Sequence, residues 1–193
     1  FRREGMDRVL SADIQRVEHR GRDKVVHFQT GGGAGEKVFD EILVGAGRMP
    51  NTDNLGLEQA GVAYDRRGVT VDAYLRTTQH RIYAAGDVAL ATKFTHAADA
   101  SARIVIQNAL FGGRRRIDRM PVPWCTYTDP EIAHVGLYPR EADARGLDAQ
   151  VFVQELRDLD RARTEGETEG FVKILTRKGR LLGATVVAPH AGD

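Results

Sequence analysis

Cysteine is almost absent from this chain of 193 residues, and the absence limits the chemistry that the chain can carry. Cys125 is the only cysteine, so neither an intrachain disulfide nor a two-cysteine redox centre can form within the chain. It follows Trp124 in a strand-like run, and free cysteine commonly packs as a small hydrophobic side chain. We therefore expect a structural role for Cys125.

A surplus of either charge is also absent. Lys and Arg number 28 against 27 Asp and Glu, so the chain lacks the basic surplus that indicates nucleic-acid binding. No apolar run approaches the roughly 20 residues that span a bilayer, and residues 1–8 lack the apolar core of a signal peptide. We expect a cytoplasmic protein with neither nucleic-acid nor membrane partners.

The chain also has no Gly-x-Gly-x-x-Gly motif between a strand and a helix, the setting in which such a loop binds a dinucleotide. The cluster Gly31–Gly35 lies between strand-like segments with no helix after it, so we interpret it as a hairpin tip. An initiator Met is missing too, and the chain stops directly after an apolar strand. These ends predict a fragment of a longer protein.

Apolar periodicity and turn signals predict two regions that differ in character. The first has strands at 14–18, 24–29, 37–39, 41–45, 69–71 and 81–85, and a helix at 96–111 that two glycines end. The second has strands at 124–128, 133–137, 150–155, 171–176 and 181–188, with a helix at 139–145. Many short strands with one helix predict an α+β domain with an antiparallel sheet, which begins near residue 121. The basic run Arg114–Arg116 before it is interpreted as a solvated linker.

The run Arg81–Asp87 indicates function most directly. A short apolar strand ends abruptly in Gly86 and Asp87, and open α/β sheets bind ligands at the carboxyl ends of their strands. Gly86 has no Cβ to hinder a ligand, and the Asp87 carboxylate can accept hydrogen bonds from sugar-type hydroxyls. The alternative for Asp87 is a helix or turn cap.

Four sequence blocks support a family resemblance. They are Glu41-Ile-Leu-Val-Gly-Ala-Gly-Arg-Met-Pro-Asn51, Ile82-Tyr-Ala-Ala-Gly-Asp87, Tyr127-Thr-Asp-Pro-Glu-Ile-Ala-His-Val-Gly136, and Gly170-Phe-Val-Lys-Ile174 with Leu182–Pro189. In this order the chain resembles the carboxyl-terminal half of the flavoprotein disulfide reductases, the pyridine nucleotide-disulfide oxidoreductase family. The first two blocks also occur in other flavoproteins that bind two dinucleotides. The last two are more specific, and the resemblance covers essentially the whole chain. Mercuric reductase-like and dihydrolipoamide dehydrogenase-like members are the most similar, with a slight preference for the former.

The resemblance implies an α/β fold for the first part of the chain. Residues 1–45 would end a nicotinamide-binding domain, and residues 46–115 would form the carboxyl-terminal part of a Rossmann-like FAD-binding domain. Residues 121–193 would form most of an α+β dimerisation domain with an antiparallel sheet. A homodimer through this last region is therefore expected.

The resemblance also implies roles for individual residues. Asp87, after Gly86, would accept a hydrogen bond from the ribityl chain of FAD. Residues 93–96, which are Lys93, Phe94, Thr95 and His96, would bring backbone N–H groups and a helix amino end against the flavin ring. Gly47 would lie near the nicotinamide nucleotide of NAD(P)H, unless it is a loop glycine needed for its dihedral angles.

Three further side chains have simpler interpretations. His96 is a helix-start residue rather than a general base. Arg48 pairs with a local carboxylate rather than with a cofactor phosphate, and His134 is packed in a strand. No catalytic residue and no metal ligand is therefore assigned within this chain.

The function implied is electron transfer between NAD(P)H, FAD and a cysteine pair, to or from a disulfide, a dithiol or mercuric ion. The cysteine pair, the two glycine-rich loops and the family's terminal histidine are absent from the sequence, so we expect the fragment alone to be inactive. Two alternatives stay open, which are a ferredoxin-reductase-like flavoprotein and a non-catalytic dimerisation module.

Overall fold

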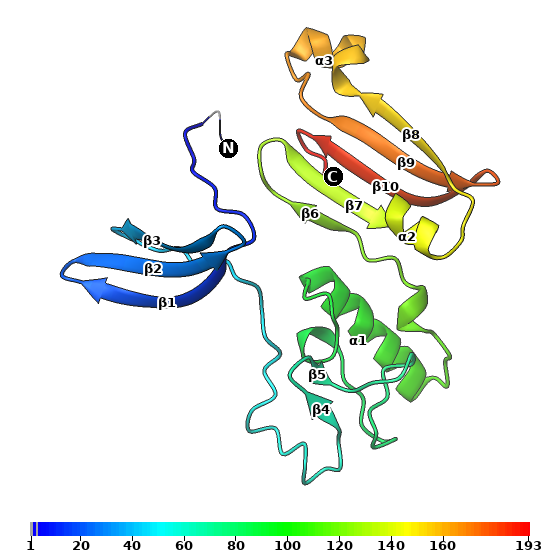
Figure 1. Ribbon diagram of the computed structural model, residues 1–193. Helices are drawn as coiled ribbons and strands as arrows, with labels where there is room; N and C mark the ends of the chain where they lie inside the picture. Colours follow the sequence, from blue (N-terminus) through cyan, green and yellow to red (C-terminus); the bar gives the residue numbers. More distant parts are fainter. Residues whose placement is uncertain (1, 3) are drawn as a thin grey trace. The chain divides into compact units, whose positions relative to one another are not determined.

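The computed structural model describes residue 2 and residues 4–193. The chain divides into two compact units, one up to Gly47 and the other from Arg48 onward. Figure 1 shows both units, coloured along the sequence.

The first unit is a three-stranded antiparallel sheet of β1 (Asp13–Arg20), β2 (Asp23–Thr30) and β3 (Gly33–Phe39), in the order β1-β2-β3. The central strand contributes Val25, which is fully buried. The glycine cluster forms the tip and first residues of the β2–β3 hairpin, so that prediction is confirmed. Gly35 also makes room for the ring of Phe28, which would lie 2.8 Å from a Cβ at this position.

The strand predicted at residues 41–45 is wrong, because this segment has no regular secondary structure. Leu43 is 98% exposed and Val44 is 80% exposed. A buried strand of a parallel sheet needs neighbouring strands for its backbone hydrogen bonds. No strand among the described residues pairs with this segment. The apolar side chains of this segment are therefore exposed, and its backbone pairs with no strand of the described residues.

The second unit begins with a short β-hairpin, β4 (Tyr64–Asp65) and β5 (Gly68–Val69). The 3-10 helix η1 (Gly86–Val88) and helix α1 (Thr95–Leu110) follow. The core of this region is made of four buried side chains, Leu75, Leu90, Ala97 and Ile104. Helix α1 was predicted within one residue at each end. Ile104 of this helix is 3% exposed, whereas Leu110 at its end is 73% exposed.

The strand predicted at residues 81–85 is also wrong. The segment makes one isolated antiparallel bridge, between Tyr83 and Arg76, and the Ala84 N–H donates to the Leu75 carbonyl at 3.1 Å. The chain turns back on itself between residues 77 and 82, so its local partner is a short preceding segment rather than a sheet. The segment still ends at a turn that begins with Gly86, where the sequence predicts that the apolar run ends.

The segment between the two predicted regions is more ordered than a solvated linker. It contains the 3-10 helix η2 (Ile117–Arg119), and the Ile117 N–H donates to the Ala73 carbonyl at 2.9 Å. Asn108 in α1 exchanges two hydrogen bonds with the backbone of Arg115, both of 2.9 Å. Arg114 and Arg115 remain exposed, whereas the half-buried Arg116 pairs with Asp118.

The remainder is a five-stranded antiparallel sheet in the order β6-β7-β10-β9-β8. Its strands are β6 (Trp124–Thr126), β7 (Glu131–Gly136), β8 (Gln150–Glu155), β9 (Phe171–Arg177) and β10 (Arg180–Ala188). All five strands were predicted, as was α2 (Pro139–Ala144). The sequence pattern missed the 3-10 helix η3 (Leu156–Asp158) and α3 (Asp160–Glu165). In Figure 1, α2 and α3 lie at opposite ends of β8.

None of the helices formed by the described residues combines the length and the apolar character that a membrane crossing requires.

Candidate functional site

The candidate site is organised by the turn that Gly86 begins. Ala85 is extended, Gly86 has a φ of +75°, and the chain then enters η1. Gly86 is buried against α1, where an added Cβ would lie 3.3 Å from the Cβ of Ala98. Its N–H donates to the Ser101 hydroxyl at 2.9 Å. The turn is therefore locked onto the first half of α1, and the glycine is needed for this packing.

Asp87 follows the turn and directs its carboxylate toward Arg48. The Arg48 guanidinium donates from Nη1 to Asp87 Oδ2 at 3.3 Å. The Asp87 side chain is 39% exposed. The N-cap position of η1 is occupied by Ala85, so Asp87 is not the N-cap of this helix. Its carboxylate keeps lone pairs for a further donor.

Lys93 and Arg48 connect Asp87 to the amino end of α1. The Lys93 ammonium donates to the carbonyl oxygens of Asp87 and Leu90, at 2.7 and 3.0 Å. Arg48 Nη1 also donates to the Lys93 carbonyl, at 3.1 Å. These bonds close residues 87–93 into a compact loop. Asp87 and the start of α1, which are eight residues apart, are thus held together.

Helix α1 begins without a side-chain cap. Phe94 occupies the N-cap position and makes no side-chain hydrogen bond there, and the first turn has no acidic residue. The N–H groups of a first helical turn have no intrahelical acceptors, and they carry the positive end of the helix dipole. Thr95 and His96 in this turn are exposed. The end is therefore suited to a group that carries or develops negative charge.

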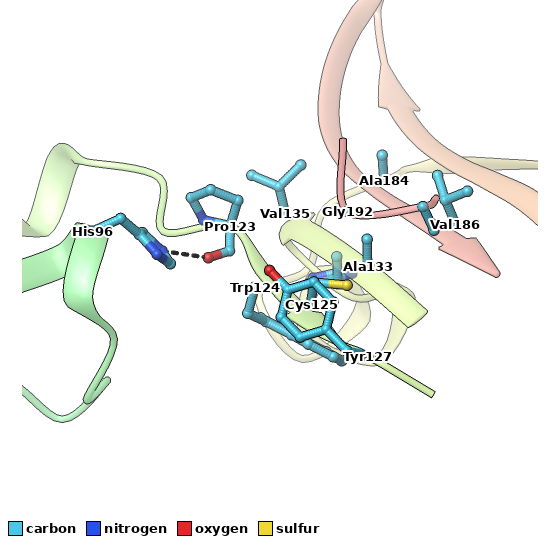
Figure 2. A pocket seen from close by; sticks show the side chains of 12 residues that line it. His96, Pro123, Trp124, Cys125, Tyr127, Ala133, Val135, Ala184, Val186 and Gly192 are labelled. Atoms are coloured by element: carbon cyan, nitrogen blue, oxygen red, sulfur yellow. Dashed lines mark hydrogen bonds between the residues drawn. The ribbon is translucent and has the colours of Figure 1, made fainter. Parts of the chain in front are cut away.

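His96 is fixed by its neighbours. Its ring stacks on Phe94, with the ring centroids 5.4 Å apart. Its Nε2 lies 2.8 Å from the Pro123 carbonyl oxygen, and a dashed line marks this hydrogen bond in Figure 2. A carbonyl can only accept, so Nε2 must carry a proton and donate. His96 is the second residue of α1, as the helix-start interpretation predicts, and its Nε2 is engaged by this hydrogen bond.

Gly47 has a φ of +96°, and a Cβ at this position would have no atom within 4 Å. The left-handed backbone conformation alone accounts for the glycine. Its proposed place beside the nicotinamide nucleotide stays a prediction.

A cavity of about 300 Å³ lies where the start of α1 meets the sheet. Figure 2 shows His96 on one side and side chains of β6, β7 and β10 on the other, among them Cys125, Val135 and Val186. Burial, together with the nearby Glu131 carboxylate, raises the pKa of the Cys125 thiol. A raised pKa keeps the thiol protonated, which disfavours a nucleophilic role and agrees with the structural one that the sequence predicts.

His134 is packed, as predicted. It is 5% exposed and stacks on Tyr138 with the ring centroids 3.7 Å apart. Its two ring nitrogens lie 2.8 Å from the Thr185 hydroxyl and 3.0 Å from the Gly136 carbonyl. The described residues contain no group of three or more His, Cys, Asp or Glu side chains that could hold a metal ion.

Sequence reasoning missed two contributions to the site. Ser101 is fully buried and holds the Gly86 N–H, but a serine inside an Ala-rich helix carries no distinctive signal. The sequence favoured a local carboxylate as the partner of Arg48 without saying which one. The structure shows that the partner is the candidate ligand-binding residue itself.

Two family profiles match the chain. Residues 1–103 match the profile described as pyridine nucleotide-disulphide oxidoreductase. Residues 122–193 match the dimerisation domain described under the same name.

Curated relatives cover nearly the whole chain. A mercuric reductase from Staphylococcus aureus is 37% identical over 98% of the chain and 35% of its own length. A dihydrolipoyl dehydrogenase from Chlamydia trachomatis is 37% identical over 100% of the chain and 41% of its own length. The chain thus spans well under half the length of these relatives.

A similar solved structure is the HOCl-induced flavoprotein disulfide reductase from Escherichia coli. It is 31% identical and superposes with a TM-score of 0.83, over 99% of this chain and 44% of its own length.

Proposed function

Because the chain belongs to the pyridine nucleotide-disulphide oxidoreductase family, we propose that it forms the carboxyl-terminal part of an FAD-dependent NAD(P)H oxidoreductase. The complete enzyme would pass electrons between the nicotinamide, FAD and a cysteine pair outside this chain. The final acceptor or donor would be a disulfide, a dithiol or mercuric ion.

The observation that carries the proposal is the joining of Asp87 to the start of α1. A partly exposed carboxylate and an uncapped helix amino end are held together by Arg48 and Lys93. The carboxylate suits a hydroxylated chain, and the helix end suits a ring system that gains negative charge. A ligand in which a hydroxylated chain is joined to such a ring system would match this pair of groups.

FAD has these two features, and the residues present fit it. Asp87 would hold a ribityl hydroxyl, and the backbone N–H groups at residues 93–96 would face the pyrimidine side of the ring. The buried Gly86 turn keeps the Asp87 backbone close to α1, where an added Cβ would crowd Ala98. When bound, FAD would accept a hydride from the nicotinamide and supply electrons to a disulfide-type acceptor.

Further parts of the proposal concern the division of the chain and its partners. Residues 1–45 would end a nicotinamide-binding domain, with Gly47 near the nicotinamide nucleotide, and residues 46–115 would belong to the FAD domain. Residues 121–193 would form a homodimer interface, which the match to a dimerisation domain supports. That match also favours this class over a ferredoxin-reductase-like flavoprotein.

The test uses the complete protein, purified with its bound cofactor. We expect a flavin absorption spectrum and oxidation of NADH or NADPH that depends on an added acceptor. Mercuric ion, lipoamide and glutathione disulfide, assayed separately, identify the acceptor class. Light scattering should give the mass of a dimer. A colourless complete protein would contradict the proposal.

Substitution of Asp87 tests the site itself. Asp87→Ala should weaken FAD binding by roughly 10- to 100-fold, as expected for the loss of a hydrogen bond to a charged group. The matched control is Arg67→Met, which breaks an exposed pair with Asp65 in the turn between β4 and β5. Equal FAD affinity in Asp87→Ala and wild type would show that the cofactor binds elsewhere.

A further inference from the structure

Arg48 makes two hydrogen bonds from a single nitrogen. Its Nη1 lies 3.3 Å from the Asp87 carboxylate and 3.1 Å from the Lys93 carbonyl oxygen. The first acceptor is a candidate ligand-binding group. The second lies two residues before α1 begins. Arg48 thus connects the two groups that the proposed function requires to act together.

Lys93 makes the complementary connection through the backbone. Its ammonium donates to the carbonyl oxygens of Asp87 and Leu90, so it holds the backbone at Asp87 in place. Arg48 then fixes the carboxylate with respect to that chain. Together they contact both the backbone and the side chain of Asp87 before any ligand is bound.

We infer that Arg48 is a positioning residue, which orients the Asp87 carboxylate and ties it to the amino end of α1 so that the cofactor meets a preorganised site. The inference rests on the proposed function, since it assigns Arg48 a part in FAD binding. Arg48 needs no contact with the cofactor for this effect. It lowers the entropy that binding would otherwise cost by ordering Asp87 in advance.

The exposure of the pair makes this role separable from folding. The Arg48 side chain is 63% exposed, and an exposed ion pair contributes little to the stability of a folded protein. Arg48→Met should therefore leave the thermal midpoint of the cofactor-free protein close to the wild-type value. Its effect should be on cofactor affinity.

The test is a double-mutant cycle on the cofactor-free complete protein, with the FAD dissociation constant measured by quenching of flavin fluorescence. Arg48→Met should raise this constant by about twofold to tenfold, the range expected for one side chain that must be ordered on binding. In the Asp87→Ala background the same substitution should change it less than twofold. Arg48→Lys, which keeps the charge, should restore part of the affinity. Arg67→Met is the control.

The outcomes separate this inference from the proposed function. Multiplicative losses in the double variant would mean that Arg48 acts on the cofactor independently of Asp87, and would overturn the inference alone. So would wild-type affinity in Arg48→Met when Asp87→Ala is weakened. Unchanged affinity in Asp87→Ala would overturn both the proposed site and the inference.

Discussion

Gly86 and Asp87 are adjacent, but they contribute to the candidate site in different ways. Gly86 provides a left-handed turn that packs on α1 through Ala98 and Ser101, so its role is visible within the chain. Asp87 provides a chemical group whose orientation depends on Arg48. The sequence assigned both residues to the ligand. The structure shows that Gly86 also packs closely against α1, where an added Cβ would lie 3.3 Å from Ala98.

Substitution of Gly86 should destabilise the fold more than substitution of a glycine in an open turn. Gly86→Ala places a Cβ in the left-handed region, at a cost of roughly 1–2 kcal/mol, and 3.3 Å from Ala98. Gly146→Ala is the control, because Gly146 has a φ of +63° and no atom within 4 Å of an added Cβ. Urea unfolding of the two variants should show the larger loss for Gly86→Ala. Equal losses would mean that α1 moves to accommodate the Cβ.

At the scale of elements, the loop at residues 72–76 depends on one carboxylate. Asp72 accepts from the N–H groups of Tyr74 and Arg76, at 2.8 and 3.0 Å, and from the Arg76 side chain at 2.9 Å. This arrangement presents Leu75, with a φ of +66°, to the core, where it is fully buried. The carboxylate therefore supports the core beneath α1.

This loop should make stability depend on pH in a defined direction. Burial raises the pKa of Asp72, but the hydrogen bonds from Arg76 and Tyr74 outweigh it and leave the pKa lowered. A pKa below that of the unfolded chain, about 3.9, gives stability that is present above that pH and is lost as pH falls through the folded value. Asp72→Asn should thus be less stable than wild type at neutral pH, with the gap closing below about pH 4.

Thermal unfolding across pH measures this gap. Asp99→Asn is the control, because it removes a carboxylate from an exposed helical pair with Arg103, which should contribute little. A gap between Asp72→Asn and wild type that stays constant from neutral to acid pH would contradict the account.

The elements also show what the sequence could predict. The five strands between residues 124 and 188 find their neighbours within the chain, and their alternation and turns were sufficient to predict them. The segments at 41–45 and 81–85 have the apolar pattern of buried strands, but no sheet among the described residues contains them. Helix α3 was missed because six residues with one buried side chain, Ala162, give no readable period.

For the site, the sequence predicted which residues lie near one another better than how they connect. Asp87 and the helix after it were chosen correctly as neighbours, because they are close in the chain. Arg48 and Asp87 are 39 residues apart in the sequence. Their contact depends on a turn conformation that residue types alone do not specify. The same limit applies to Ser101, whose role is visible only once α1 lies against Gly86.

At the scale of the whole molecule, the chain carries parts of a site whose remainder belongs to a longer protein in our proposal. Relatives of which it spans 35% to 41% include mercuric reductase and dihydrolipoyl dehydrogenase, at the same identity of 37%. The acceptor is therefore a property to measure on the complete enzyme. In our proposal the chain would contribute the ribityl-binding carboxylate, the helix end and the sheet of the dimerisation domain.

The most direct measurement is an experimental structure of the complete protein with FAD bound. We predict a ribityl hydroxyl within hydrogen-bonding distance of the Asp87 carboxylate, about 2.6–3.0 Å, with Arg48 still bound to the opposite side of that carboxylate. The pyrimidine edge of the ring should face the N–H groups at the start of α1. A flavin bound away from Asp87, with the carboxylate engaged only by Arg48, would contradict the account.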